Sequence, residues 1–379
     1  MRLLRHLTPT GPAYAALQPD GTRTQKPVRE RLCKSNPALW DEIARVKIEE
    51  FRANPKLLTA SICPNDGGAN QFCVCEACRA LDQQGGATAS LSDRVFTFYN
   101  EIATRVAREM PDRGLVAYAY SVYRDPPVRV RALSPNLIVG FVGLDQSSIE
   151  AWSRIAPKLY IRPNDLGPVI DLGMPRNHAA HLAQSVKFAV EHKAIGFDFD
   201  NCHGNWSNHG LDYYILAKAL RDPELDVRAA IADYCRAAYG PGGEAMGRYH
   251  DRLEKIGDSV RADPLLTAKS PHAARLRTHY SDAALADLDN EIKTAREAIG
   301  TGDSAALARV EMAAEGVKYA RLVTSLLEVA HEKKSAEYAN RFTAVETFLK
   351  SKVLTSELAP LHSYRYLRMA LAYAKREVE

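Results

Sequence analysis

The stretch Ser61-Ile62-Cys63-Pro64-Asn65-Asp66-Gly67-Gly68 is the most informative part of this 379-residue chain, and Cys73-Val74-Cys75-Glu76-Ala77-Cys78 follows shortly after it. The first stretch has the pattern of a buried strand that ends at a carboxylate. In a (β/α) barrel the catalytic residues lie at the carboxyl ends of the strands. The two stretches therefore predict a barrel strand, a candidate site at its tip and a cysteine cluster beside it.

Outward from this strand, short apolar runs alternate with amphipathic helical stretches from about residue 30 to 220. We expect strands at 31–33, 57–63, 115–123, 137–142, 158–162 and 195–199, and helices at 37–53, 92–110, 147–156, 175–192 and 211–220. This alternation is typical of parallel βα units, which predicts an α/β fold. A closed barrel needs eight strands, and only about six are expected here. Either two further strands lie near the N-terminus or the chain starts inside a barrel, and the turn-rich character of the first thirty residues favours the second interpretation. We therefore predict a TIM-like (β/α) barrel that lacks its first strands in this chain.

The sequence changes character at Gly240-Pro241-Gly242-Gly243. Beyond these helix-breaking residues, Ala, Glu, Lys, Arg and Leu dominate with helical periodicity up to the last residue. We predict two domains: an N-terminally incomplete (β/α)-barrel domain of catalytic type over residues 1–240, and an α-helical bundle over residues 241–379.

The composition is that of a globular protein, with 46% hydrophobic and 25% charged residues. The net charge is only +4 and there is no block of Lys and Arg, which argues against a nucleic-acid partner. No apolar run is long enough to predict a membrane span. The first seven residues contain basic side chains but no apolar segment, so they do not resemble a signal peptide. Taken alone, this favours a cytoplasmic location or a truncated start.

Three carboxylates are candidate catalytic residues. Asp66 follows a strand and precedes two glycines, which would let a ligand approach the backbone closely. Asp198 and Asp200 alternate with Phe197 and Phe199 and so share one face of a late strand. Paired carboxylates are what glycoside hydrolysis requires, and it needs no cofactor. The alternative is local: a turn at Asp66, and a helix cap or turn at Asp200.

Other polar and aromatic residues follow the predicted strands and are candidate sugar contacts. These substrate-binding candidates are Asn65, Tyr120, Tyr123, Arg124, Arg162, Asn164 and Trp206. An indole face such as that of Trp206 suits the C–H face of a pyranose. The alternatives are packing beneath a loop for the aromatic rings and a salt bridge for Arg162.

The cysteines suggest a metal site. The spacing Cys73-x-Cys75-x-x-Cys78 resembles metal-ligand spacing, and Cys33 is the nearest candidate for a fourth ligand. Four thiolates would hold a structural zinc ion, because they leave no open position for catalysis. The alternative is one disulfide with free thiols.

Several segments between roughly residues 10 and 255 resemble a known family. They are Leu32-Cys33-x-Ser35-Asn36-Pro37; Pro64-Asn65-Asp66-Gly67 with Cys73-x-Cys75-x-x-Cys78; the strand that leads to Trp206; Gly210-Leu211-Asp212-Tyr213-Tyr214 through Asp222-Pro223; and Asp233-Tyr234-Cys235 with Tyr239-Gly240. In these segments the chain resembles the bacterial family catalogued as domain of unknown function 4838, whose characterised branch is glycoside hydrolase family 163.

The resemblance implies a TIM-like barrel followed by helices, export from a bacterial cell to the periplasm or exterior, and action on glycans. The characterised branch looks like endo-β-N-acetylglucosaminidases that act on N-glycans. This chain departs from it in two places: it has Asp198-Phe199-Asp200 where a glutamate would be sought, and Arg162-Pro163-Asn164 looks like a different subgroup. Only Asp66 and the Asp198/Asp200 pair are carried over as catalytic candidates.

Three hypotheses follow. In the first, the protein is a glycoside hydrolase, in which Asp66 protonates the leaving oxygen and Asp198 or Asp200 stabilises the oxocarbenium-like centre. In the second, it is a carbohydrate-binding barrel without catalysis. In the third, it is a truncated homologue without activity, whose open sheet edges would favour association.

Overall fold

A computed structural model describes residues 14–23, 31–65, 71–82, 90–164, 172–200, 206–266, 275–331 and 335–353. The chain divides into two compact units. The sheet unit comprises Met1–Asp165 and Phe188–Asp200, and the helical unit comprises Leu166–Lys187 and Asn201–Glu379. The predicted domain boundary between residues 240 and 241 stays a prediction.

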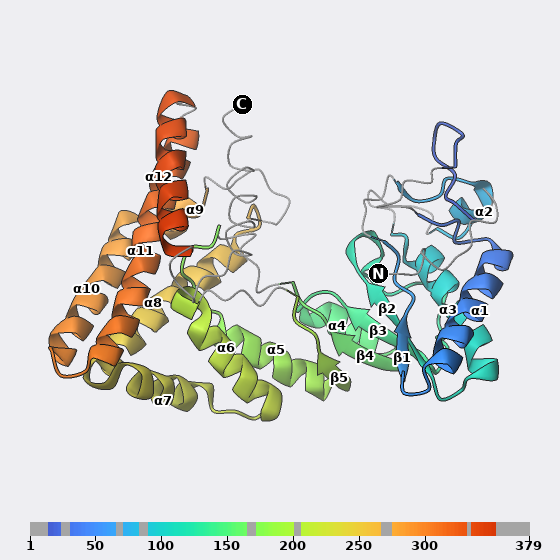
Figure 1. Cartoon of the computed structure of the whole chain (residues 1–379), viewed down its shortest axis with the longest axis horizontal. Helices are drawn as coiled ribbons and strands as arrows, with labels where there is room; N and C mark the ends of the chain where they lie inside the picture. Colours follow the sequence, from blue (N-terminus) through green and yellow to red (C-terminus); the bar gives the residue numbers. More distant parts are fainter. Residues whose placement is uncertain are drawn as a thin grey trace. The chain divides into compact units, whose positions relative to one another are not determined.

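The sheet unit is built on five parallel strands that lie in chain order (Figure 1). The strands are β1 (Thr59–Ser61), β2 (Gly114–Ala119), β3 (Leu137–Phe141), β4 (Lys158–Ile161) and β5 (Ala194–Phe197). The predicted α/β fold with a parallel sheet is therefore confirmed. The sheet is open: β1 and β5 are its two edge strands among the described residues, so a closed barrel is not seen there.

The expected strand at 31–33 is wrong. Leu32 forms only an isolated antiparallel bridge with Ala15. The backbone of this segment bonds to the neighbouring segment instead, since Ala16 N–H donates to the Arg31 carbonyl at 2.8 Å and Cys33 N–H to the Tyr14 carbonyl at 2.8 Å. These two short segments hold each other and do not extend the parallel sheet.

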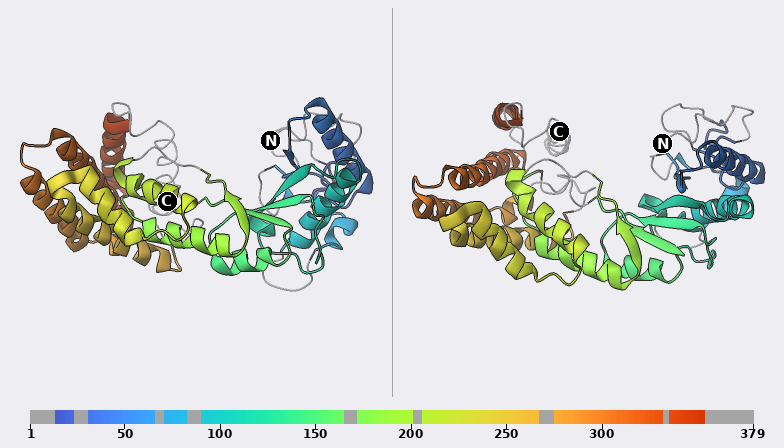
Figure 2. Two further views of the ribbon diagram at one scale, coloured as in Figure 1. Left: turned by 90° about the horizontal axis from the view of Figure 1, so that it is seen from below. Right: turned by 60° about the horizontal axis from the view of Figure 1, so that its bottom comes forward.

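One face of the sheet is covered by a layer of helices (Figure 2). In this layer α3 (Ser92–Glu109) packs on β2 and β3, α1 (Pro37–Ala53) packs on α3, and α4 (Gln146–Ser153) contacts α3. The side chains that point toward these helices are fully buried, namely Leu115, Ala117, Ala119, Leu137, Val139 and Phe141. Trp152 of α4 lies 4.7 Å from the ring of Phe96 of α3, which joins the two helices over the sheet. Removing this apolar surface from water is what holds the layers together.

The opposite sheet face is less apolar and less covered. Thr59 and Ser61 of β1 are exposed, and Tyr118 of β2 and Tyr160 of β4 are only partly buried. Side chains alternate between the two faces of a strand, so each of these residues neighbours a buried one in sequence. The sheet therefore has a structural face and a polar, aromatic face.

Local signals start the covering helices. Asn36 accepts a hydrogen bond from the Ala38 N–H at 3.0 Å, and Pro37 follows as the first helical residue of α1. Asp145 accepts from the Ser148 N–H at 3.1 Å at the start of α4. A short helix, α2 (Glu76–Arg79), begins after Cys75. The start of α1 at Asn36 lies close to Cys33, and α2 begins directly after Cys75, so the starts of these helices lie in the segments that carry the candidate metal ligands.

The helices expected beyond residue 240 are present in the helical unit: α8 (Gly243–Ala262), α9 (Leu276–His279), α10 (Asp282–Ile299), α11 (Ser304–His331) and α12 (Ser335–Val353). The unit also holds α6 (Trp206–Arg221), where a helix was expected at 211–220, most of α5 (Ala179–Glu191), and α7 (Val227–Tyr239), which was not predicted. Figure 1 shows α10, α11 and α12 side by side. Buried apolar residues from several helices of this unit form one continuous core, which includes Met246 of α8, Leu288 of α10 and Leu326 of α11. Within the described residues, no helix has both the length and the apolar character that crossing a bilayer demands.

A histidine is buried in this helical unit. His250 of α8 is 8% exposed, and its Nε2 lies 3.4 Å from the hydroxyl of Tyr239. Its backbone carbonyl accepts a hydrogen bond from Asn177 Nδ2 at 3.2 Å. Burial lowers the pKa of His250 from 6.5 to about 4, although the charge of Asp212 opposes that shift. The imidazole is therefore neutral in the folded protein at neutral pH.

This burial predicts a loss of stability in mild acid. Because the folded pKa lies below the unfolded one, the unfolded chain binds more protons as pH falls from 6.5 towards 4. Between pH 7 and pH 5 this one group should lower the free energy of unfolding by about 2 kcal/mol. Urea unfolding of the wild type and His250→Gln at both pH values measures it. Parallel pH profiles for the two proteins would contradict the assignment.

Candidate metal centre and strand-edge site

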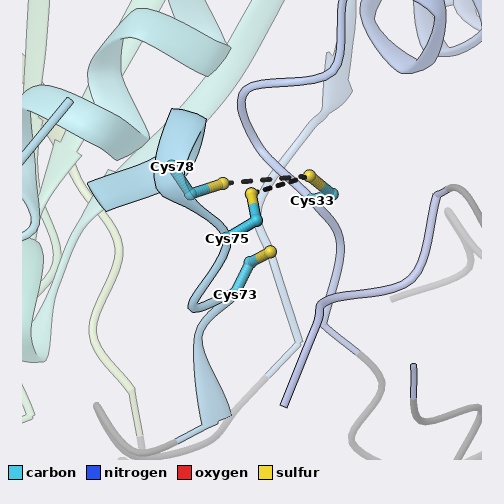
Figure 3. A group of neighbouring side chains, drawn as sticks. All are labelled: Cys33, Cys73, Cys75 and Cys78. Carbon is cyan, nitrogen blue, oxygen red and sulfur yellow. Dashed lines mark hydrogen bonds between the residues drawn. The ribbon is translucent and has the colours of Figure 1, made fainter. Parts of the chain in front are cut away.

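The four predicted cysteine ligands come together in the sheet unit (Figure 3). The sulfur atoms of Cys33, Cys73, Cys75 and Cys78 all lie within 4.8 Å of one another. Cys33 Sγ is 3.7 Å from Cys75 Sγ and 3.9 Å from Cys78 Sγ. All four are free thiols, and all but Cys75 are buried. The sequence prediction that these residues form one cluster is confirmed.

Two segments position these sulfurs. Cys33 lies just before α1, whereas Cys73 and Cys75 precede α2 and Cys78 lies within it. Both segments bond to a third one, residues 14–17: Cys33 N–H donates to the Tyr14 carbonyl at 2.8 Å, and Val74 N–H donates to the Leu17 carbonyl at 2.9 Å. Leu17 N–H also donates to Cys73 Sγ at 3.2 Å. The cluster is therefore formed by residues far apart in sequence.

The sulfur geometry fits a metal ion better than a disulfide. A zinc–sulfur distance of about 2.3 Å in a tetrahedral site places the sulfurs about 3.8 Å apart. The sulfur–sulfur distances of 3.7 and 3.9 Å agree with this value. A disulfide needs about 2.05 Å between the sulfurs. The cluster could hold one metal ion.

The thiols shift one another's pKa values through hydrogen bonds and charge. Hydrogen bonds from Cys33 and then Cys78 hold the pKa of the Cys73 thiol far below its usual range. The same interactions with Cys33 and Cys73, together with burial, raise the pKa of Cys78. The pKa directions thus favour ionisation of Cys73 and oppose ionisation of Cys78. A divalent cation would remove that opposition, because metal binding displaces thiol protons.

Buried cations surround the cluster. Lys34 is 2% exposed, and burial lowers its pKa to about 7 while the charges of Cys78 and Cys33 act in the opposite direction. Arg94 of α3 pairs with Asp82 and donates from Nη1 to the Cys73 carbonyl at 2.7 Å. The guanidinium of Arg31 lies 4.4 Å from the centroid of Phe72. Buried basic residues therefore flank the cysteine segments.

A second group of predicted residues meets at the carboxyl ends of β4 and β5. Arg162 Nη2 lies 3.1 Å from Asp200 Oδ1, and Arg162 Nε lies 3.7 Å from Asp198 Oδ2. Nη1 of the same arginine donates to Asn164 Oδ1 at 3.0 Å. Phe197 and Phe199, which alternate with the two aspartates in sequence, stack on each other with their ring centroids 5.7 Å apart. Asp198 is 58% exposed, so this strand-edge site is open to solvent.

Two tyrosines extend the strand-edge site along the polar face of the sheet. The Arg162 guanidinium lies 4.9 Å from the ring centroid of Tyr118, and the Tyr118 and Tyr160 rings are 6.4 Å apart. In the sheet register, Tyr118 pairs with Gly140 and Gly140 pairs with Tyr160. A Cβ at Gly140 would lie 2.5 Å from the Tyr160 ring. Glycine therefore allows the tyrosine ring to lie over the middle strand.

The structure separates other predicted contacts from the strand-edge site. Tyr123 is buried, with its ring 6.1 Å from that of Phe72, and Arg124 pairs with the cap residue Asp145. Tyr120 and Asn65 are partly buried and have partners. Asp66 lies outside the described residues, as does the side chain of Trp206, the first residue of α6. Their roles in catalysis or sugar binding stay predictions.

Tyr118 and Tyr160 were not predicted from the sequence. Each lies two residues before a predicted candidate, Tyr120 and Arg162, and so shares its strand face. That spacing could have revealed them once the strands were assigned. The role of Gly140 could not be predicted, because it depends on the register of three strands.

The Gly140 packing can be tested by substitution. Gly140→Ala should lower the free energy of unfolding by about 1–3 kcal/mol, since the added methyl group collides with the Tyr160 ring. Gly196→Ala in β5 is a matched control, because a Cβ there meets nothing within 4 Å. Chemical denaturation of both variants measures the difference. Equal stabilities would show that the Tyr160 ring does not lie over β3.

Comparison with known proteins assigns the chain to a family. The model of the family described as Domain of unknown function (DUF4838) matches residues 5–251. No curated protein matches the chain. Because the matched segment covers more than half of the 379 residues, this protein belongs to the DUF4838 family.

Proposed function

We propose that this protein is a glycoside hydrolase that acts on glycans, resembling the endo-β-N-acetylglucosaminidases of glycoside hydrolase family 163. In this proposal the five parallel strands are part of a TIM-like barrel, and the substrate binds at their carboxyl ends. The protein would act in the bacterial periplasm or outside the cell. The motifs shared with the family and the position of the carboxylates support the proposal.

The observation that carries the proposal is the Arg162–Asp198–Asp200 cluster beside the Tyr118 ring. Carboxylates that pair with an arginine are negatively charged, so they suit the stabilisation of an oxocarbenium-like centre. The adjacent tyrosine ring offers a face against which a sugar can pack. Asp198, the more exposed of the two aspartates, is the better candidate for contact with the sugar.

A hydrolase also needs a proton donor. Aspartates paired with arginine do not suit that role, because a general acid must carry a proton. Asp66 remains the candidate acid in this proposal. In sequence it follows the carboxyl end of β1, as Asp198 follows the carboxyl end of β5.

A second candidate function is carbohydrate binding without catalysis. The same ion pairs favour it, since Arg162 occupies both carboxylates and Asn164 as well. Under this alternative the arginine, amide and aromatic groups bind a glycan, and no bond is broken. An inactive homologue is the third reading, in which neither binding nor turnover occurs.

Glycan release separates these functions. The purified protein is incubated with N-glycoproteins, and released glycans are measured by mass spectrometry. Asp198→Asn and Asp66→Asn should each lower the rate by about 10²–10⁴-fold, because each removes a catalytic group. Asp112→Asn is the control, since Asp112 is exposed and precedes β2 at the opposite edge of the sheet.

Each outcome selects one function. Release by the wild type and the control alone supports the hydrolase. Binding of glycans without release supports the carbohydrate-binding alternative. Full activity of Asp198→Asn would remove this residue from the mechanism.

We further infer that the cysteine cluster binds a structural zinc ion. Four thiolates saturate a tetrahedral site, so the ion would fix the chain and would not contact substrate. It would join the segment before α1 to the segment that contains α2, whose buried cysteines share one small apolar cluster with Ala16. Zinc would therefore contribute to folding stability.

Metal analysis tests this inference. The protein purified under reducing conditions should contain about one zinc ion per chain by elemental mass spectrometry. Cys78→Ser should abolish binding, and chelation should lower the melting temperature of the wild type. Cys235→Ser is the control, because Cys235 is equally buried but lies in α7 of the helical unit. A wild-type protein that contains no metal would contradict the proposed zinc site.

A further inference from the structure

The most unusual charge in the sheet unit is the ammonium group of Lys34. The residue is 2% exposed, and lysine is almost never this buried unless it is paired. Within the described residues no carboxylate lies within ion-pairing distance of Lys34 Nζ. The group contacts aromatic rings instead, at 4.4 Å from the Phe98 centroid and 5.8 Å from the Phe72 centroid. Such contacts offset only part of the loss of water.

The cysteine cluster, once it holds a divalent ion, would carry an excess of negative charge. A divalent ion with four thiolates carries a net charge of –2, which is costly to bury without compensation. Arg94 offers little to it, because the charge of its guanidinium is already balanced by Asp82. Lys34 directly follows the ligand Cys33, and no described carboxylate pairs with its side chain.

The chain between Cys33 and α1 directs Lys34 inward. The Lys34 carbonyl accepts a hydrogen bond from Trp40 Nε1 at 2.7 Å, which fixes the backbone at this residue. Ser35 Oγ lies 3.2 Å from Cys78 Sγ on the other side. In sequence, Lys34 thus lies between the candidate ligand Cys33 and Ser35, whose hydroxyl contacts the candidate ligand Cys78. Its side chain packs under α3, where Phe98 lies.

We propose that Lys34 is the buried counter-cation of a four-thiolate divalent metal site formed by Cys33, Cys73, Cys75 and Cys78. The inference rests on the proposed zinc site and adds a residue that does not touch the metal. The ammonium group lowers the net charge of the occupied cluster from –2 to –1. The occupied cluster in turn compensates a lysine that otherwise lacks an anionic partner. Lys34 is therefore a positioning residue that sets the affinity for the ion.

Metal affinity of charge-altered variants tests this role. Lys34→Met and Lys34→Gln remove the charge, whereas Lys34→Arg keeps it. Zinc affinity is measured by competition with a chromophoric chelator, and cobalt substitution reports thiolate coordination by its absorption spectrum. Both neutral variants should bind zinc about 10- to 100-fold more weakly, and Lys34→Arg should lie closer to the wild type.

Lys47→Met is the matched control. Lys47 of α1 is also buried, at 6% exposure, but it pairs with Glu50 at 2.7 Å. Its substitution should leave zinc affinity unchanged. Circular dichroism of each protein establishes that it is folded, and if Lys34→Met fails to fold, the comparison of Lys34→Gln with Lys34→Arg replaces it.

The outcomes distinguish the two proposals. A wild type that binds no zinc contradicts the zinc site itself. A wild type that binds zinc as tightly as folded Lys34→Met or Lys34→Gln overturns the counter-cation role and leaves the zinc site intact. An equal loss in Lys47→Met would also overturn it, because the effect would then reflect any buried lysine.

Discussion

The sheet unit depends on the burial of one apolar sheet face beneath α1, α3 and α4. The residues of β2 and β3 that point toward these helices have no exposure to solvent. Since side chains alternate along a strand, fixing that face also fixes the other one. The polar and aromatic residues of the opposite face are thus displayed as a consequence of how the core packs. Tyr118 and Tyr160 owe their positions to this constraint.

The cysteine cluster secures the segments that the sheet does not order. The backbone of the residues before α1 bonds to a short neighbouring segment, residues 14–16, and their apolar core is small. Sulfur atoms from two distant parts of the chain meet there and surround a volume suited to one ion. Small cores of this kind commonly rely on a metal or a disulfide for stability. The start of α1, which covers the sheet, directly follows this cluster.

Charge is arranged differently at the two clusters of the sheet unit. At the strand edge, Arg162 is balanced by Asp198 and Asp200, and the group is accessible to solvent. Around the cysteines, Lys34 is buried without a described carboxylate, so its compensation has to come from elsewhere. An exposed ion pair contributes little to stability, whereas a buried charge has a large effect on what binds beside it. The two clusters therefore have different chemical consequences.

The sequence by itself determined the parallel α/β order, the helices of the C-terminal region, the family and the membership of the cysteine cluster. These features follow from local periodicity and from residue types at fixed spacing, which do not need knowledge of distant contacts. The strand at 31–33 was wrong because three residues, Arg31, Leu32 and Cys33, are too few to show the period that tells a strand from an extended segment. Only the tertiary structure decided that Arg162 pairs with both aspartates, that Tyr123 and Arg124 pack away from them, and that Gly140 leaves room for Tyr160. Those contacts depend on strand register and burial, which arise when residues far apart in sequence compete for the same space and the same charge.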